Sequence, residues 1–510
     1  MNNVQPSSFD EFELAAASGN VVPIVRTVSI DSLTPITAFG RMSKGAHYAF
    51  LLESVEGGEV NARYSFLGAN PEMIVRGKGP RTFIERAGAV EILDVCAWDF
   101  VRDYFHQKRL STSFAKGPFA GGAVGYLGYG AARWFEPSIS PKGVDNANDD
   151  SVFMFYRTVI ALDRISSTLT ITHVVLIDEA QGDRSRLHAL YNRGVAEIAE
   201  VERLLTQDYD FEQSEIPASF KPDQTPFESN WARQNFEAAV TSVREHIAAG
   251  DCYQVVLSQR FFRQVFATPI SIYRALQAIN PSPYMYLLHL GDESIVGASP
   301  EMLVRCRGTR LDYRPIAGTR PRGINEYQDR QLASEMRSDE KELAEHMMLV
   351  DLGRNDLGRV ANYGSVCVDE LLKVECYSHV QHLVSSLSAT LRNGLDRFDA
   401  FASCFPAGTV TGAPKVRAME IISQLEPESR GVYAGAVVYA DYADNLDSCI
   451  AIRTIALRDG SASVQAGAGI VADSIPQLEY EETVNKAKAL FRALQMAEEI
   501  HIKTKAMTVR

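Results

Sequence analysis

Three charged side chains near the C-terminus share one face of an expected helix. Within QAGAGIVADSIPQLEYEETVNKA (465–487), Glu479, Glu482 and Lys486 are three and four residues apart. At about 100° per residue these positions lie within about 60° of one another. A separate apolar stripe is formed by Val484, Ala487, Phe491 and Leu494. Taken alone, a Glu/Lys face of this kind is typical of solvated salt bridges on a helix.

A second pair of carboxylates makes a metal site the alternative interpretation. Residues 338–356 also have a helical pattern, in which Glu342 and Glu345 are three apart. Two helices that each present a carboxylate pair could hold one hard cation, and Mg²⁺ prefers oxygen ligands. Such an ion would balance the charge of an anionic substrate. Spacing alone leaves both interpretations open.

The glycines before the C-terminal helix could also indicate a nucleotide site. We expect a turn here, and Gly467, Gly469 and Ala472 match the pattern G-x-G-x-x-A. A dinucleotide fold needs a further strand that ends in an acidic residue about 20 residues later. Only one helix and a tail remain in the chain. We therefore expect the glycines to bring backbone N–H groups close to a different anionic ligand.

Three other stretches are rich in residues that can bind or react. PIAGTRPRG (315–323) is expected to be a glycine-containing turn with a hydroxyl and two arginines. FPAGTVTGAPK (405–415) is expected to be a loop that leads into an amphipathic helix. YSHVQHLVSSL (377–387) alternates as a strand does, and it carries His382, a candidate general acid or base. A lone histidine is more often a core residue, so this assignment depends on its neighbours.

Composition places the chain among soluble globular enzymes. Of its 510 residues 46% are hydrophobic, and the net charge of −13 argues against nucleic acid or anionic membranes as partners. No apolar run reaches the roughly 18 residues of a membrane span, and the N-terminus lacks a targeting pattern, so we expect a cytoplasmic protein. The seven cysteines form no C-x-x-C pair and are expected to be buried free thiols in a reducing compartment.

Internal similarity suggests that the chain is a duplication. FLGANPEMIVRG (66–77) matches IVGASPEMLVRC (295–306), and two further strand-like matches follow in the same order. We expect an α/β (α+β) fold with two large, mainly antiparallel sheets packed face to face and helices outside. We expect a tail at 1–20, an N-terminal region at 21–205, a linker at 206–227 and a catalytic region at 228–505.

The motifs resemble those of the chorismate-utilising enzymes, and among them the anthranilate synthase component I family. PIAGTRPRG, DLGRNDLGRV, HLVSSL, FPAGTVTGAPK and the stretch at 465–487 occur in the order of that family, over about residues 228–490. LLESVEGGEVNARYSFLG (51–68) is similar to the N-terminal region of the same family. In anthranilate synthases, ammonia adds to the chorismate ring as the 4-hydroxyl leaves, and pyruvate is then eliminated.

The resemblance implies a role for each matching residue. Glu301 would protonate the departing hydroxyl, and His382 and Thr409 would lie against the reacting ring. The chorismate-binding positions would be Gly318, Thr319, Tyr433, Arg453, Gly467, Ala468, Gly469 and Lys486. Mg²⁺ would hold the ring carboxylate, and its carboxylates would be Glu345 and Glu482, with Glu342 and Glu479 beside them.

Two positions help to choose within the family. Isochorismate and salicylate synthases carry a lysine base where this chain has Gln254, and glutamine has no titratable nitrogen. Aminodeoxychorismate synthases often carry a nucleophilic lysine where this chain has Ala317. The pair favours anthranilate, with aminodeoxychorismate as the alternative product. An inactive tryptophan-binding protein is the non-enzyme alternative, and it would predict damaged motifs.

The resemblance also implies regulation and a partner. Ser54, Pro283, Tyr284 and Met285 match the tryptophan feedback site of the family. No cysteine has the surroundings of a glutaminase nucleophile, so ammonia is expected from a separate glutamine amidotransferase subunit, in a heterodimer or heterotetramer.

The duplication pairs two candidate residues with first-half counterparts. Glu72 corresponds to Glu301 and Arg157 to Arg453, yet the first half lacks a helix with paired glutamates. We therefore expect only the second half to be catalytic.

Overall fold

The computed structural model describes most of the chain. The described residues are 4–30, 33–54, 63–111, 118–139, 149–207, 226–377 and 380–508, without the side chains of 319, 341 and 501–508. Most of the expected linker at 206–227 lies outside these ranges. The segment expected as a tail contains a helix, α1 (Phe9–Ala16), whose Phe12 is fully buried.

In the described ranges, two antiparallel sheets of 12 strands each form the centre of the molecule. The first sheet has the order β1 (Val21–Ser29), β10 (Thr168–Leu176), β9 (Thr158–Asp163), β3 (Tyr64–Ala69), β2 (Tyr48–Glu53), β13 (Tyr284–Leu290), β14 (Glu293–Ser299), β23 (Thr454–Arg458), β24 (Ser461–Ile470), β12 (Gln254–Gln264) and β11 (Glu228–Ser229), with β20 (Gly412–Ala413) beside β12. The second has the order β17 (Ile316–Pro321), β19 (Val380–Thr390), β16 (Arg310–Tyr313), β15 (Met302–Arg307), β22 (Asn445–Ile450), β21 (Ala436–Asp441), β7 (Gly122–Leu127), β8 (Ser151–Tyr156), β4 (Met73–Lys78), β5 (Arg81–Arg86) and β6 (Ala89–Leu93), with β18 (Cys367–Cys376) beside β19.

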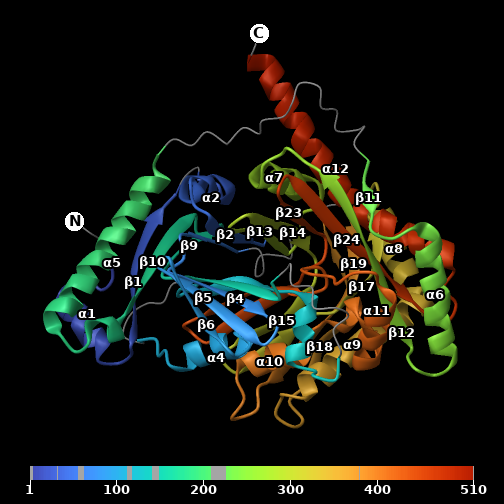
Figure 1. Cartoon of the computed structure of the whole chain (residues 1–510), viewed down its shortest axis with the longest axis horizontal. Helices are drawn as coiled ribbons and strands as arrows, with labels where there is room; N and C mark the ends of the chain where they lie inside the picture. Colours follow the sequence, from blue (N-terminus) through green and yellow to red (C-terminus); the bar gives the residue numbers. More distant parts are fainter. Residues whose placement is uncertain are drawn as a thin grey trace.

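The strand order is symmetric about the middle of each sheet. The halves meet where β2 pairs with β13 and where β7 pairs with β21. Outward from these pairs, β3, β9, β10 and β1 mirror β14, β23, β24 and β12, and β8, β4, β5 and β6 mirror β22, β15, β16 and β19. This order confirms the expected duplication. It also shows that the two halves share both sheets instead of forming one sheet each (Figure 1).

Helices cover the outer faces of the sheets, as expected. They are α2 (Pro35–Ser43), α4 (Ala97–His106), α5 (Arg184–Leu205), α6 (Arg233–Ala248), α7 (Pro269–Ile279), α8 (Glu326–Ser338), α9 (Glu340–Gly358), α10 (Arg397–Cys404), α11 (Lys415–Leu425) and α12 (Pro476–Thr508), besides α1 and the short turns η1 (Tyr129–Trp134), η2 (Ile177–Ala180) and η4 (Gly408–Val410). Helices α2 and α7 occupy equivalent places in the two halves and begin alike. Each has a threonine N-cap, Thr34 or Thr268, followed by a proline at the first helical position.

Four apolar clusters of the described residues hold these layers together. The cluster between the sheets includes Phe50, Tyr156 and Tyr286, all nearly inaccessible to solvent. The rings of Phe50 and Tyr156 meet edge to face at 4.8 Å, a geometry favoured by aromatic quadrupoles. Two of the other clusters lie under the helices, where α5, α7 and α12 pack on the first sheet and α4 and α10 on the second.

Several local predictions were wrong. Residues 316–321 form strand β17 and not a turn; a bulge at Gly318, with φ of +61°, bends it. Gly467 and Gly469 lie inside β24 and not in a turn. Cys367 and Cys376 are exposed on β18, an edge strand whose residues are mostly exposed. The cysteine prediction failed because it rested on apolar neighbours in the sequence, which β18 leaves in solvent.

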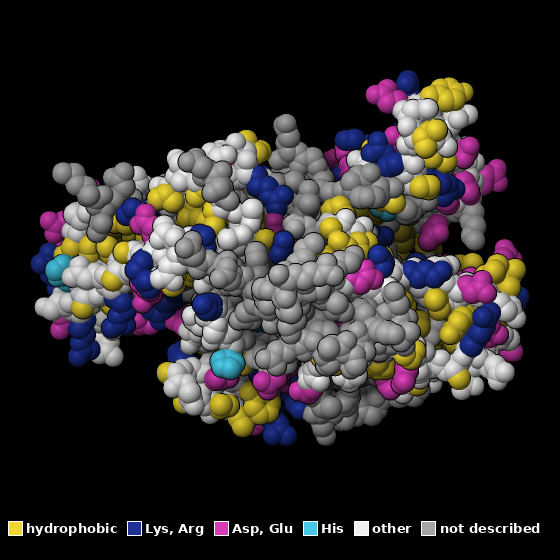
Figure 2. Space-filling view, turned by 90° about the horizontal axis from the view of Figure 1, so that it is seen from above, with side chains coloured by type: hydrophobic (Ala, Val, Ile, Leu, Met, Phe, Trp, Pro, Cys, Tyr) yellow, Lys and Arg dark blue, Asp and Glu magenta, His cyan; other side chains and the backbone are white. Residues whose placement is uncertain are grey.

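The surface carries both signs of charge. On the face in Figure 2, Lys and Arg side chains are interspersed with Asp and Glu. None of the helices in the described ranges is both long and apolar enough to cross a membrane.

Candidate active site

The candidate site lies where the chain passes between the two sheets. Glu301 lies between β14 of the first sheet and β15 of the second, and Arg453 lies between β22 and β23. The backbone of Arg453 is left-handed, with φ of +49°, which is uncommon for a residue with a β-carbon. The crossings therefore place an acid and a cation from distant segments next to each other.

Glu301 is buried and holds its proton at neutral pH. Its exposed fraction is 7%, and burial raises the pKa of its carboxyl to about 8, although the nearby Thr409 hydroxyl and the charge of Arg453 oppose the rise. Thr409 belongs to η4, in the loop that the sequence predicted. A carboxyl with this pKa can donate a proton near neutral pH, as a general acid must.

His382 is neutral at the same pH. Burial and the nearby charge of Arg453 lower the pKa of the imidazole to about 4. Its Nδ1 lies 3.3 Å from the carbonyl oxygen of Gly318, and because a carbonyl only accepts, Nδ1 carries the proton. Nε2 is then an acceptor. The predicted strand at His382 is confirmed as β19, and the backbone of Thr319 pairs with it; the Thr319 side chain lies outside the described part.

A cavity of about 230 Å³ reaches from His382 and Arg453 to α12, whereas Glu301 and Thr409 are not among its lining residues. His382, Arg453 and Lys486 line it, together with Asn280 and Asn485. Asn280 Oδ1 lies 3.4 Å from a guanidinium nitrogen of Arg453. Among the described residues that line the cavity there is no Asp or Glu, whereas two cations are present. The lining therefore favours an anion, although Lys486 is also paired with Glu482, which lies outside the lining.

The glycines of β24 allow close approach on the other side of the site. A β-carbon on Gly467 would lie 2.8 Å from the hydroxyl oxygen of Tyr433, and one on Gly469 would lie 2.4 Å from Nε2 of Gln254. The Gly467 carbonyl accepts a hydrogen bond of 3.0 Å from the Lys486 ammonium. Ala468, between the two glycines, is fully buried. The structure thus brings β24, Tyr433 and Lys486 together.

The four candidate metal carboxylates lie on α9 and α12, as expected. Glu482 is paired with Lys486 at 2.7 Å, and Glu342 is paired with Arg320. In the part of the chain that the structure describes, no three His, Cys, Asp or Glu side chains already form a metal-binding group. Glu345 and Glu479 are placed on the same two helices, the first exposed and the second half-buried.

One of these carboxylates nevertheless has the character of a ligand. Glu342 Oε2 is buried without a hydrogen-bond partner, and a β-carbon on Gly318 would lie 2.6 Å from it. A buried carboxylate oxygen that lacks a partner costs free energy unless a cation or donor arrives. The residue types and this oxygen fit a hard divalent cation such as Mg²⁺.

A second and larger cavity adjoins the first. It measures about 600 Å³ and is lined by all four residues expected to bind tryptophan, Ser54, Pro283, Tyr284 and Met285. Both cavities are lined by Pro283, Pro300, Ile316 and Tyr377. The shared wall means that a molecule in one cavity lies next to the other.

In the first half, the residues equivalent to Glu301 and Arg453 are held in ion pairs. Arg157 is paired with both Glu72 and Glu179, whereas its counterpart Arg453 faces Asn280 and the cavity. The first half therefore uses the equivalent acid and cation to neutralise each other.

Sequence reasoning missed two residues that the structure adds. Asn280 orients Arg453, and Arg320 neutralises Glu342. Arg320 belongs to the arginine-containing motif at 315–323, so the sequence indicated this residue but not its role. Asn280 offered no such signal, because only the fold brings it to Arg453.

Comparison with known proteins agrees with this geometry. The family model described as chorismate binding enzyme matches residues 47–492. Anthranilate synthase component 1 of Acetivibrio thermocellus is 42% identical over 97% of this chain and 99% of its own length, and that of Pseudomonas aeruginosa is 40% identical over 96% and 99%. The crystal structure of anthranilate synthase component I from Streptococcus pneumoniae has a TM-score of 0.71 at 36% identity, covering 86% of this chain and 94% of that one. The menaquinone-specific isochorismate synthase of Escherichia coli shares the fold, with a TM-score of 0.66 at 18% identity over 96% and 99% of the two chains.

The chain belongs to the chorismate binding enzyme family, and it is an enzyme that acts on chorismate. The family resemblance drawn from its motifs is thereby confirmed.

Proposed function

We propose that this protein converts chorismate and ammonia to anthranilate and pyruvate, as a cytoplasmic enzyme of tryptophan biosynthesis. The feature that carries the proposal is the buried Glu301 carboxyl, whose pKa burial raises to about 8, close to Arg453 of the cationic cavity. Chorismate is a dianion, so the two cations would bind it. Glu301 would give its proton to the departing 4-hydroxyl as ammonia adds to the ring.

The neutral His382 suits the same reaction. Its unprotonated Nε2 can accept a hydrogen bond or a proton, and its Nδ1–H is held by the Gly318 carbonyl. Arg453 acts on both groups, since its positive charge opposes protonation of His382 and favours ionisation of Glu301. An acid and a potential base with well-separated pKa values are thus present in one site.

Gln254 and Ala317 support anthranilate over the other family products. The Gln254 side chain is buried against Gly469, where an amide can donate or accept a hydrogen bond but cannot take a proton from water. Ala317 adjoins Gly318 on β17 and offers no nucleophile. Aminodeoxychorismate remains the alternative, because a route without a covalent amine would also lead to it.

Identification of the product tests the proposal directly. Purified protein is incubated with chorismate, Mg²⁺ and ammonium, and the product is identified by mass and fluorescence. We expect anthranilate and pyruvate in equal amounts. Aminodeoxychorismate or isochorismate as the product would contradict the proposal, and omission of ammonium is the control that distinguishes amination from addition of water.

The proposal includes a metal and a partner. Bound Mg²⁺ would neutralise the ring carboxylate of chorismate, and Glu345 and Glu482, with Glu342 and Glu479 near them, would hold the ion. The curated relatives are named component 1, which supports a second component. That component would be a glutamine amidotransferase that supplies ammonia, in a heterodimer or heterotetramer.

We also propose that tryptophan occupies the 600 Å³ cavity and inhibits the enzyme. Besides the four expected residues, the lining includes Arg305 and Asp447, which are paired at 2.7 Å. Tyr284 also interacts with both charged side chains. A cavity that combines aromatic and aliphatic side chains with charged groups of both signs fits an amino acid with an indole side chain. Tryptophan there would act by favouring a state that binds chorismate weakly.

Filling this cavity is expected to weaken inhibition. Ser54→Leu adds an apolar branch to the lining, and overpacking of about 1–3 kcal/mol corresponds to roughly 5- to 150-fold weaker tryptophan binding. The measurements are tryptophan titrations of activity and of the melting temperature, with leucine as the control ligand. Equal tryptophan sensitivity in the variant and the wild type would place the inhibitor elsewhere.

A further inference from the structure

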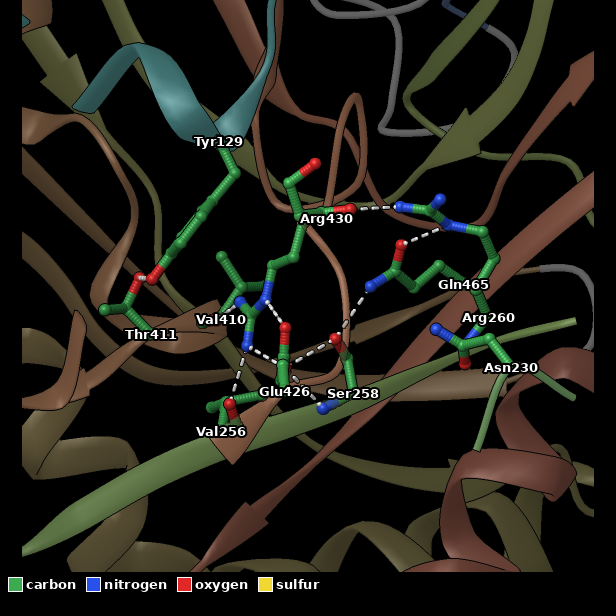
Figure 3. Close-up of polar contacts among 11 residues, drawn as sticks. Tyr129, Asn230, Val256, Ser258, Arg260, Val410, Thr411, Glu426, Arg430 and Gln465 are labelled. Atoms are coloured by element: carbon green, nitrogen blue, oxygen red, sulfur yellow. Dashed lines mark hydrogen bonds and ion pairs between the residues drawn. The ribbon is translucent and has the colours of Figure 1, made fainter. Parts of the chain in front are cut away.

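A buried ion pair lies beside the candidate site but outside the expected set of residues. Arg430 and Glu426 have side-chain exposures of 1% and 4%. The guanidinium donates two hydrogen bonds to the carboxylate, from Nε to Oε2 at 2.9 Å and from Nη2 to Oε1 at 2.7 Å. Figure 3 shows the pair with its neighbours. Two-point contacts of this kind fix the orientation of both groups.

The pair is bonded to two backbone segments that carry candidate residues. Arg430 donates to the carbonyl of Val410 at 2.8 Å and to that of Val256 at 2.7 Å (Figure 3). Val410 directly follows Thr409. Glu426 Oε1 accepts from both the backbone N–H and the hydroxyl of Ser258, each at 2.8 Å.

The two β12 residues in this network lie opposite the glycines of β24. In the strand register, Val256 faces Gly469 and Ser258 faces Gly467. The ion pair therefore holds the strand on which the glycine segment rests, and it holds the Thr409 loop through Val410. It links two parts of the site that are distant in sequence.

The guanidinium also lies against two tyrosine rings. Its central carbon is 4.5 Å from the ring centre of Tyr129 and 5.7 Å from that of Tyr433. Tyr433 is the candidate substrate contact whose hydroxyl lies next to Gly467. Tyr129 comes from the first half, and its hydroxyl lies 3.5 Å from the hydroxyl of Thr411 in the same loop (Figure 3).

Burial of such a pair is not needed for stability alone. Removing two charges from water is costly, and well-packed apolar residues of similar volume often stabilise a fold as well or better. A planar guanidinium instead supplies donors in fixed directions, which a lysine ammonium does not. Its distinctive contribution here is geometric.

We propose that Arg430, held by Glu426, is a positioning residue for the reaction at this site. It sets the relative placement of Thr409, Tyr433 and the strand that supports Gly467 and Gly469. The inference rests on the proposed function at one point, namely that these groups contact chorismate. It adds a role for the first half, since Tyr129 completes the stack on the guanidinium.

The test compares two buried Arg–Glu pairs. Arg430→Lys keeps the positive charge but loses the planar guanidinium, whose donors point in fixed directions. Because misplacement of reacting groups by about 1 Å can cost 10²-fold in rate, we expect a fall in kcat of about 10²-fold. Arg263→Lys is the matched control, because Arg263 pairs with Glu498, both side chains are fully buried, and the guanidinium lies over the ring of Phe227, which is not a candidate residue. We expect it to lower the melting temperature while kcat per folded site stays near the wild-type value. Folded sites are counted by calorimetric titration.

A double-mutant cycle distinguishes positioning from a general structural role. If Arg430 acts through the Thr409 loop, Arg430→Lys combined with Thr409→Ala should lose little more kcat than the larger single loss. Losses that multiply, or an unchanged kcat in Arg430→Lys, would overturn the proposal. If Arg430→Lys does not fold, Tyr129→Leu replaces it, with an expected fall of about 3- to 10-fold from loss of the stacked ring.

Chorismate consumption, and not anthranilate alone, is the measured rate. A product other than anthranilate would refute the proposed function, while the same rates would still test Arg430. If the wild type did not turn over, chorismate affinity would be the readout. Arg430→Lys should then bind more weakly than Arg263→Lys, and equal affinities would overturn the inference.

Discussion

We expect Glu301→Gln to lower kcat for chorismate by about 10²–10⁴-fold, the usual contribution of a general acid. Glutamine keeps the shape and the hydrogen bonding of the buried side chain but has no proton to give to a leaving hydroxyl. KM should change much less, because the cations of the cavity, Arg453 and Lys486, remain. Steady-state rates with saturating ammonium measure both constants.

Glu72→Gln is the matched control. Glu72 occupies the equivalent crossing in the first half and is already paired with Arg157, so its carboxylate is committed to a structural contact. We expect turnover near that of the wild type. A loss as large as that from Glu301→Gln would refute the view that only the second half is catalytic.

The pH dependence of kcat should follow the same carboxyl. Glu301 must be protonated to act, and burial raises its pKa to about 8, so kcat should be maintained below pH 8 and fall as the pH rises through it. Rates are compared at equal concentrations of free NH₃, because the ammonium ion also loses its proton as pH rises. A kcat that is flat from pH 7 to 9 would contradict this assignment.

The pH dependence of folding stability that comes from Glu301 should have the opposite sign to that of a salt-bridged carboxylate. The folded state holds the Glu301 proton more tightly than the unfolded chain, in which this carboxyl has its ordinary pKa of 4.5. The free energy of unfolding therefore falls as pH rises from about 4.5 to about 8 through this group. Glu301→Gln should remove that part of the dependence, which melting curves across this range would detect.

We expect Glu482→Gln to weaken Mg²⁺ binding and to lower kcat/KM at limiting Mg²⁺ by about 10²–10³-fold, since a metal ion that neutralises substrate charge is worth several kcal/mol. Loss of one carboxylate removes a predicted ligand of a site that must offset a dianion. Chelation of divalent cations from the wild type should have the same effect, and Mg²⁺ should restore the rate. Mg²⁺ titrations of activity and of the melting temperature provide two independent readouts.

Glu481→Gln is the control for the metal prediction. Glu481 is the neighbour of Glu482 on α12, is similarly exposed, and contacts Arg233 at 3.3 Å. It should leave the Mg²⁺ response unchanged. Because Glu482 also pairs with Lys486, saturating Mg²⁺ separates the two effects: a rate that recovers reports metal affinity, whereas one that stays low reports the lysine. Full activity of the chelated wild type would remove the metal from the proposal.

Local patterns in the sequence determined many of the elements. The helices expected at 338–356 and after 476 are present as α9 and α12, and the apolar stripe of α12 is buried at Ala487 and Leu494. The repeated Pro-Glu-Met motif identified the duplication, because equivalent strands keep similar apolar spacing. Spacing could not distinguish a turn from a strand at 316–321 or at Gly467, because glycine is common in turns and also wherever a strand needs close approach.

The candidate site itself depended on tertiary structure. Motif resemblance selected Glu301, yet its raised pKa results from burial where the chain crosses between the sheets, which no neighbouring residue in the sequence indicates. Asn280 and Arg430 gained their roles in the same way, through contacts with segments more than a hundred residues away. Sequence alone determined the class of reaction and the charged groups available for it. Only the packing of the two sheets, which both halves of the chain share, decided which groups are buried and which ion pairs form. It thereby also decided which charged side chains remain to bind an anionic substrate.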